Sequence, residues 1–362
     1  MRSLWHARIL RYLRNWASSS HLSKKDLGLE KMSEGFKTVM LDSVLYLTDI
    51  ERDRMSDIGS SIEQYDIYEP EDILKVAKDA DAIMTVSAHV TREVIEQLER
   101  CRVIARYGCG FDNVDTKAAT EKGIVVTYVP VYCQKDVATM AVSLLLACER
   151  RLFKADAATK RGDWVSCSQL VEGARSIDGK TVGLVGFGRI AQAAAPMLQA
   201  FGANIITYDP AVNKELAAKM NVTSVDFDTL ISTSDAISIH CPKTAETIHM
   251  IGRPQFEKMK KGVIIVNTGR GAVIDQAELA KAIKEGIVGG AGLDVLDPEP
   301  PELEDELYSL DNVICSGHTA ACTIESVDRL RRAVAENVAN VLTGKMPLEC
   351  ANPEVLEKLD LK

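Results

Sequence analysis

The stretch that decides the fold is Thr181 to Asp209, TVGLVGFGRIAQAAAPMLQAFGANIITYD, near the middle of the chain. It reads as an apolar strand, a glycine turn, a helix and a second strand, which together make one βαβ unit. Gly186 and Gly188 stand at the turn, and Ala191 fills the third position of a G-x-G-x-x-G/A pattern, where a small residue lets helix and strand pack closely. A helix that begins at about Arg189 directs free backbone N–H groups and the positive end of its dipole toward the turn. That field suits a pyrophosphate.

Asp209 extends this pattern, since it lies 21 positions after Gly188 at the end of the strand Asn204 to Tyr208. An acidic side chain in that place accepts hydrogen bonds from an adenosine ribose. The glycines alone also fit an ordinary tight turn. The flanking strand, the helix and Asp209 together favour a dinucleotide-binding site.

Length and composition set the frame for the rest of the chain. A chain of 362 residues exceeds the size at which single cores usually stop growing, so two domains are expected. With 46% hydrophobic and 26% charged residues the composition is globular, and no apolar run approaches the length of a membrane span. The net charge of −9 argues against nucleic acid as a partner, because a phosphate-binding surface needs a basic field.

The nine cysteines are scattered and form no C-x-x-C pattern. Cys101, Cys148, Cys241 and Cys315 lie within apolar segments, so they read as buried thiols in a reducing compartment.

The first residues are basic and amphipathic, with four arginines and no acid before Asp26. A mitochondrial targeting segment and a disordered leader both fit this composition, and Met32 offers a second start. We therefore keep residues 1–36 out of the fold argument. Cytoplasm is the expected location, with the mitochondrial matrix as the alternative.

From Lys37 to Val126 the pattern alternates strand and helix, which predicts a first parallel α/β domain. The expected elements are strands over 38–47, 82–87, 102–108 and 124–129 and helices over 71–78, 92–98 and 117–122. No glycine fingerprint occurs among these strands, so this domain is expected to hold the second substrate.

A long helical pattern over 134–153 suits a helix that bridges two domains. Beyond Asp209 the alternation continues with helices over 213–220, 253–259 and 276–285 and strands over 236–240, 263–267, 289–295 and 312–316. This predicts a doubly wound sheet, in which ligands bind beyond the carboxyl ends of the strands. A last helix over 323–342 is expected to cross back to the first domain.

Three residues on the loops at that edge suit acid–base chemistry on an acidic substrate. Arg270 follows a buried strand, where its guanidinium can bind a carboxylate through two parallel hydrogen bonds, although a structural ion pair is the alternative. His318 follows the strand VICS and titrates near neutral pH, although a lone histidine is more often a core or cap residue. Glu299 is the partner we name for it, because a hydrogen-bonded carboxylate fixes the tautomer of an imidazole and raises its pKa. Glu302 and Glu304 in the same loop are competing carboxylates.

The chain resembles the family of D-isomer-specific 2-hydroxyacid dehydrogenases over about residues 37–350. The motifs that carry the likeness are RYGCGFDNVD (106–115), LVGFGRIA (184–191), YDP (208–210), VNTGRGAVID (266–275), GLDVLDPEP (292–300) and His318. The resemblance implies a Rossmann NAD-binding domain over 136–321, inserted in a flavodoxin-like substrate domain formed by 37–135 and 322–350. The fold class is thus α/β with two doubly wound parallel sheets.

The resemblance also implies roles for single residues. Arg270, Glu299 and His318 would form the catalytic triad, in which the histidine exchanges the substrate proton, the glutamate supports it and the arginine holds the carboxylate and carbonyl. The implied NAD-binding residues are Gly186, Gly188, Arg189, Ile190, Asp209, Cys241, Thr268, Gly269, Arg270, Asp294 and His318. Gly108, Cys109 and Gly110 match the family's loop for the substrate carboxylate, and no metal site is expected.

Several positions depart from the family pattern. The usual V-A-E-H of the hinge helix is Val137 to Met140, VATM, and the proline common before the catalytic histidine is Gly317, which could loosen His318. The stretch AACTIES also resembles the C-terminal-binding-protein branch, although Cys322 stands where that branch has an aromatic residue. The expected activity is therefore interconversion of a small D-2-hydroxy acid and its 2-keto acid by a homodimer. An NADH-sensing corepressor and a 3-phosphoglycerate dehydrogenase remain alternatives.

Overall fold

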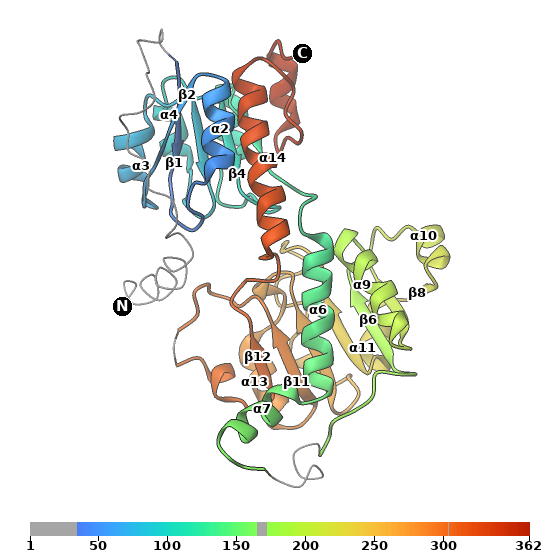
Figure 1. The fold of residues 1–362 in the computed structure, drawn as a ribbon. Coiled ribbons are helices and arrows are strands. Elements are labelled where there is room, and N and C mark those ends of the chain that lie inside the picture. Colours follow the sequence, from blue (N-terminus) through green and yellow to red (C-terminus); the bar gives the residue numbers. More distant parts are fainter. Residues whose placement is uncertain (1–34, 165–171, 303) are drawn as a thin grey trace.

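Two parallel sheets organise the chain in the computed structural model, which describes residues 35–164, 172–302 and 304–362 (Figure 1). The leader discussed above lies almost wholly outside the described residues. The first sheet contains β1 (Phe36–Met40), β2 (Ser60–Gln64), β3 (Ala82–Thr85), β4 (Val103–Arg106) and β5 (Val125–Thr127). Its strand order is β2-β1-β3-β4-β5, the flavodoxin-like order.

The second sheet contains β6 (Thr181–Val185), β7 (Asn204–Tyr208), β8 (Val222–Ser224), β9 (Ala236–Ile239), β10 (Val263–Asn267), β11 (Val288–Leu293) and β12 (Val313–Cys315). All its pairs are parallel, in the order β12-β11-β10-β9-β6-β7-β8. The order reverses between β6 and β9, which is the switch point where a doubly wound sheet binds its dinucleotide. The predicted fold class is therefore confirmed for both sheets.

Helices cover the two sheets and connect them. Those around the first sheet are α2 (Asp49–Asp57), α3 (Pro70–Ala77), α4 (Arg92–Gln97) and α5 (Thr116–Lys122). Those around the second are α9 (Arg189–Ala200), α10 (Lys214–Lys219), α11 (Phe227–Thr233), α12 (Arg253–Phe256) and α13 (Gln276–Lys284). The other helices in the described part of the chain are α6 (Gln134–Glu149), α7 (Leu152–Lys160) and α14 (Ile324–Leu342), with 3-10 turns at Gly271–Val273, Glu306–Ser309 and Pro353–Lys358.

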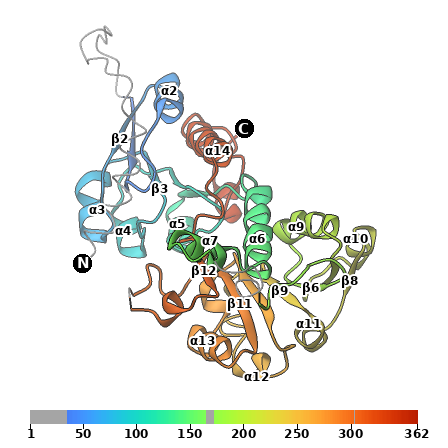
Figure 2. The ribbon, with the colours of Figure 1, turned by 60° about the horizontal axis from the view of Figure 1, so that its bottom comes forward.

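The two long helices α6 and α14 carry the chain between the sheets. Helix α6 packs on α9, β10 and β11, whereas α14 returns to the first sheet and packs on α2 and β4 (Figures 1 and 2). Their N-terminal ends are tied together, because Asp136 accepts hydrogen bonds from Thr323 Oγ1 at 2.8 Å and from Arg329 Nη2 at 2.7 Å. We propose that the two domains divide near these helix starts, at about residues 135 and 322.

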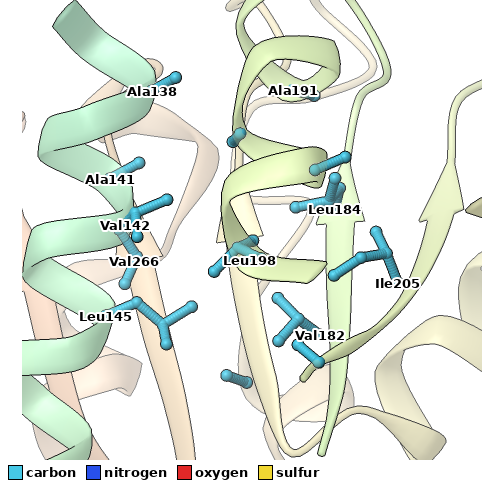
Figure 3. Packing of buried hydrophobic residues seen from close by; sticks show 14 of the residues in the cluster. Ala138, Ala141, Val142, Leu145, Val182, Leu184, Ala191, Leu198, Ile205 and Val266 are labelled. Atoms are coloured by element: carbon cyan, nitrogen blue, oxygen red, sulfur yellow. The ribbon is translucent and has the colours of Figure 1, made fainter. Parts of the chain in front are cut away.

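Small residues let α6 and α9 lie close to the second sheet (Figure 3). Ala138 and Ala141 of α6 face a buried cluster that contains Leu198 of α9 and Val182 and Leu184 of β6. Ala191, the third position of the glycine motif, belongs to the same cluster and is fully buried. The βαβ unit is thus part of the core on which α6 rests.

Some elements differ from the sequence prediction. The helix predicted over 134–153 ends at Glu149, because Arg151 has a φ of 50°, and α7 begins afresh after it. The strand predicted over 38–47 ends at Met40. Two residues later, the Asp42 carboxylate accepts the N–H groups of Val86, Ser87 and Ala88, and the chain does not continue as a strand. Four further elements were not predicted: β2, β8, α2 and α11. Each is short, polar or at a sheet edge.

Candidate active site

The glycine turn after β6 has the geometry of an anion-binding helix start. Gly186 has a φ of +89°, a backbone conformation that residues with a side chain rarely adopt. Its N–H donates to Tyr208 O at 2.8 Å. Gly188 is the N-cap of α9, and the first helical bond runs from Gln192 N to Gly188 O. The N–H groups of Arg189 and Ile190 precede that bond, so they have no partner within the helix and face the turn.

Asp209 is held beside this turn at the end of β7. Its Oδ2 accepts the Phe187 N–H at 2.8 Å, and its Oδ1 accepts the Ala211 N–H at 2.8 Å. The carboxylate is therefore fixed next to the glycines, with lone pairs left for a ribose hydroxyl.

The loops after β9, β10 and β11 complete the edge of the sheet. Thr268 is buried, and its hydroxyl oxygen has no hydrogen-bond partner among the described residues. Gly269 lies against Cys241, because a Cβ at Gly269 would meet Cys241 O at 3.0 Å. A dinucleotide fits this edge, since the turn offers free N–H groups, Asp209 offers an acceptor and Thr268 offers an unsatisfied hydroxyl.

Asp294, just past β11, positions the segment that carries His318. It is buried and its Oδ1 accepts from Ser316 Oγ at 2.6 Å, Thr319 N at 2.9 Å and Ala320 N at 3.1 Å. Its backbone O accepts the His318 N–H at 2.6 Å. The histidine loop is therefore anchored to the end of the neighbouring strand.

His318 and Glu299 form a direct contact. His318 Nδ1 lies 2.7 Å from Glu299 Oε2, and Glu299 Oε1 accepts the Leu296 N–H at 3.1 Å. The hydrogen bond that His318 Nδ1–H donates to Glu299 raises the pKa of His318 above its ordinary value, against the opposing effect of burial. Burial raises the pKa of Glu299, but the hydrogen bond and charge of His318, with the Leu296 N–H, outweigh it and hold that pKa below its usual range. The pair is therefore biased toward imidazolium and carboxylate.

Gly317 and His318 both have a positive φ, of +64° and +58°. Proline fixes φ near −65°, so the proline common at position 317 in the family does not fit this backbone, whereas glycine does. The two contacts of His318, through its N–H and its Nδ1, fix it in this conformation.

Arg270 lies on the turn after β10 and faces the loop after β4. Its Nη1 donates to Gly269 O at 2.9 Å, and the one ion pair that the described part of the chain gives it is with the exposed Asp112, at 4.0 Å. A Cβ at Gly110 would lie 2.5 Å from Arg270 Nη2, so the arginine approaches the backbone of that loop. The long distance to Asp112 leaves the guanidinium able to bind an incoming carboxylate.

The turn of Arg270 also touches the loop of Glu299. A Cβ at Gly271 would lie 2.1 Å from the carbonyl carbon of Leu296, so the two backbones are in direct contact there. Glu302 and Glu304, the competing carboxylates, are exposed. The loop geometry therefore selects Glu299 as the carboxylate that contacts His318.

The loop Gly108, Cys109 and Gly110 comes from the first sheet. Gly108 has a φ of +133°, and its O accepts the Val129 N–H at 2.9 Å. Arg106, beside this loop, was given no role in the sequence prediction. Its Nη1 donates to Tyr107 O, and its Nε is buried without a partner among the described residues. Burial lowers the pKa of Arg106, and the charge of Arg270 adds to this. Its place at the start of the motif RYGCGFDNVD was the signal that could have indicated it.

The structure thus brings the predicted residues together from both sheets.

Within the described residues no group of three or more His, Cys, Asp or Glu side chains could hold a metal ion. Nor is any helix in the described ranges both long and apolar enough to cross a bilayer.

Comparison with known proteins defines the class of this fold and site. Residues 142–320 match the family model of the NAD-binding domain of D-isomer-specific 2-hydroxyacid dehydrogenases. The chain is 39% identical to a glyoxylate reductase of Thermococcus litoralis over 289 residues, which is 78% of this chain and 87% of that protein. It is 38% identical to a D-3-phosphoglycerate dehydrogenase of Archaeoglobus fulgidus over 311 residues, 86% of this chain but 58% of that protein.

Among solved structures, a D-lactate dehydrogenase of Aquifex aeolicus complexed with NAD and lactic acid superposes with a TM-score of 0.75. The identity is 26%, over 89% of this chain and 98% of that one. The chain belongs to the D-isomer-specific 2-hydroxyacid dehydrogenase family, as the motifs predicted, and it is an NAD-dependent enzyme of that family.

Proposed function

We propose that this enzyme interconverts a small D-2-hydroxy acid and its 2-keto acid, with Arg270, Glu299 and His318 as the residues that act on the substrate. The observation that carries the proposal is the 2.7 Å contact between His318 Nδ1 and Glu299 Oε2, on the same sheet edge as an arginine that faces the loop of the first domain. The names of the relatives, glyoxylate reductase and D-3-phosphoglycerate dehydrogenase, support a small acidic substrate.

Each of the three residues has one task in the reductive direction. When bound, NADH supplies the hydride. His318, protonated on both ring nitrogens, delivers the Nε2 proton to the carbonyl oxygen, while Glu299 accepts the Nδ1–H and favours the charged form. Arg270 binds the carboxylate through two hydrogen bonds and polarises the carbonyl, and the amides of the loop at Gly108 to Gly110 receive the other side of the carboxylate.

The pH dependence of reduction tests the histidine and glutamate pair. Because the pKa of His318 is raised, the imidazolium persists below that pKa and the reduction rate should fall as pH rises through it. Glu299→Gln removes the charge that raises this pKa. The fall in the rate of keto-acid reduction should therefore move to lower pH, whereas keto-acid binding should change little. The measurement is kcat as a function of pH between about 5 and about 9, a range that brackets the ordinary pKa of histidine.

The variants Glu302→Gln and Glu304→Gln are matched controls, because they change the same charge in the same loop on exposed side chains. Their profiles should follow that of the unmodified enzyme. A profile that moves with either control and not with Glu299→Gln would assign the carboxylate to the wrong residue.

Cofactor choice tests the role of Asp209. We expect NADH to be preferred over NADPH, because the fixed carboxylate repels a 2′-phosphate and no arginine or lysine follows before Lys214. In Asp209→Ala, the kcat/KM value for NADPH should come closer to that for NADH. Equal use of both by the unmodified enzyme contradicts the assignment.

A substrate screen distinguishes the enzyme from the alternatives. NADH oxidation should be followed with glyoxylate, pyruvate, hydroxypyruvate and phenylpyruvate, and with 3-phosphohydroxypyruvate for the phosphoglycerate alternative. Turnover of one of the first four supports the proposal. NADH binding with no turnover of any of the five favours an NADH-sensing corepressor of the C-terminal-binding-protein kind.

We also propose a homodimer, formed through the cofactor domain with help from the apolar helix α6. A monomeric mass by light scattering contradicts it. Cytoplasm is the proposed location, with the mitochondrial matrix as the alternative, and sequencing of the mature N-terminus in its source cells distinguishes them.

A further inference from the structure

A buried ion pair joins two helices of the first domain. Glu51 of α2 has no exposed surface, and Arg331 of α14 is 9% exposed. Arg331 Nη1 donates to Glu51 Oε1 at 2.6 Å and to Tyr46 O at 2.7 Å. Helices α2 and α14 pack on each other beside the first sheet, so the pair lies between them (Figure 1).

Tyr107 connects this pair to the loop at Gly108 to Gly110, which we call the substrate loop. Tyr107 directly precedes Gly108 and is buried, and its hydroxyl donates to Glu51 Oε1 at 3.1 Å. Burial raises the pKa of Tyr107 well above its ordinary value, so the hydroxyl stays protonated and remains a donor. A single carboxylate oxygen therefore accepts from both Tyr107 and Arg331.

The second oxygen of Glu51 is also held. Glu51 Oε2 accepts the Thr48 N–H at 3.0 Å and the Thr48 hydroxyl at 2.7 Å, in the capping box that begins α2. Both carboxylate oxygens thus have two donors each. The carboxylate cannot rotate without breaking several of these bonds, so it is a fixed acceptor for Tyr107.

The substrate loop itself has free donors. No hydrogen bond from the N–H groups of Cys109 and Gly110 occurs within the part of the chain that the structure describes. The loop is held from one side by Val129, whose N–H donates to Gly108 O at 2.9 Å. A buried ion pair is a weak source of stability, because desolvation offsets the attraction between the charges. Its contribution here is geometric, since it holds the residue at the start of this loop.

We propose that Glu51, Arg331 and Tyr107 are positioning residues for the substrate carboxylate. The buried pair fixes the Tyr107 hydroxyl, and Tyr107 fixes the loop whose free N–H groups bind the carboxylate. This inference rests on the proposed function. The three residues act through the substrate loop, so their replacement should change the affinity for the keto acid and not the proton transfer by His318.

Tyr107→Phe is the first test, because it removes the hydroxyl and keeps the ring in the core. The probe is oxamate, an unreactive carboxylate with the shape of pyruvate, titrated into the full chain with bound NADH and followed by NADH fluorescence. We expect the Kd of oxamate and the KM of the keto acid to rise about tenfold, as loss of one hydrogen bond to a charged group can cause. The kcat value, its pH profile and the Kd of NADH should change little.

Glu51→Gln tests whether the hydroxyl acts through the carboxylate. Glutamine keeps the shape and suits this position of a capping box, but it removes the charge that Tyr107 and Arg331 share. The Kd of oxamate should rise here too. The double variant Tyr107→Phe/Glu51→Gln should bind oxamate no more weakly than the weaker single variant, because both changes break the same link. A merely structural role would lower Tm and leave the Kd of oxamate unchanged.

Arg54→Gln is the matched control. Arg54 forms a partly exposed ion pair with Glu336, 2.7 Å from Nε to Oε2, which joins the same two helices. This variant should bind oxamate like the unmodified chain. An equal loss of affinity in Arg54→Gln overturns the inference, since any break between the helices would then have the same effect.

Three other results also overturn the inference: an unchanged Kd of oxamate in Tyr107→Phe, additive effects of Tyr107→Phe and Glu51→Gln, or no binding of oxamate to the unmodified chain. A chain that binds oxamate but reduces none of the keto acids contradicts the proposed function alone. The Kd values of the variants then decide the positioning role without any turnover.

Discussion

His318→Ala should lower kcat for keto-acid reduction by about 10²–10⁴-fold, the range typical for loss of a general acid. The reason is that the ring of His318 is half-exposed at the site and is oriented by the 2.7 Å bond to Glu299, which leaves its other nitrogen to donate the proton. NADH oxidation at saturating keto acid measures the effect. NADH affinity, measured by fluorescence, should change little.

His249→Ala is the matched control for this prediction. His249 is exposed, lies outside the site and, like His318, has a positive φ, of 53°, so the two variants share the same backbone change. Its kcat should be that of the unmodified enzyme. Equal losses in the two variants would mean that a distorted backbone, and not a missing acid, lowers the rate.

Arg270→Lys should lower kcat/KM by about 10²–10³-fold, as removal of one positioned donor does, with part of the loss in KM. Lysine keeps the positive charge but cannot form two parallel hydrogen bonds to a carboxylate. The guanidinium has little else to hold it, because Asp112 is 4.0 Å away and exposed. Steady-state kinetics over a keto-acid concentration series separates KM from kcat.

Arg253→Lys provides the comparison. Arg253 forms exposed ion pairs with Glu257 and Glu285, and Arg253→Lys should leave both kcat and KM unchanged. If Arg270→Lys leaves KM for the keto acid unchanged, Arg270 does not bind the substrate carboxylate.

Much of the fold could be predicted from the sequence, because buried parallel strands leave uniform apolar runs. The strands at 204–208 and 263–267 were predicted with their observed bounds. Edge elements were missed for a physical reason: β2, SSIEQ, has one exposed face and alternates with polar residues, so it gives no apolar run. The end of α6 depends on the φ of Arg151, which no helix propensity encodes.

Only part of the candidate site could be predicted from the sequence. The motifs indicated Arg270, Glu299 and His318, but the acidity of the loop alone could not select Glu299 over Glu302 or Glu304. The contact with Leu296 N–H and the approach of His318 from the next strand make that selection, and both depend on the loop's path in space.

The cysteines show the same limit. Cys148 is buried as predicted, but Cys101, Cys241 and Cys315 are half-buried. Cys109 and Cys133 lie on the segments that follow β4 and β5, which are neighbours in the first sheet although they are separate in the sequence. Pairing of distant segments is a property of the sheet order and not of local composition.

The backbone contact between Gly271 and Leu296 ties the turn of Arg270 to the loop of Glu299, and both segments follow strands of the second sheet. The loop at Gly108 to Gly110 follows β4 of the first sheet. On the proposed function, the residues that act on the proton and the carbonyl therefore come from one sheet, and the loop that receives the carboxylate comes from the other. Substitutions in the loop after β4 can then change the substrate range without altering the contact of His318 with Glu299.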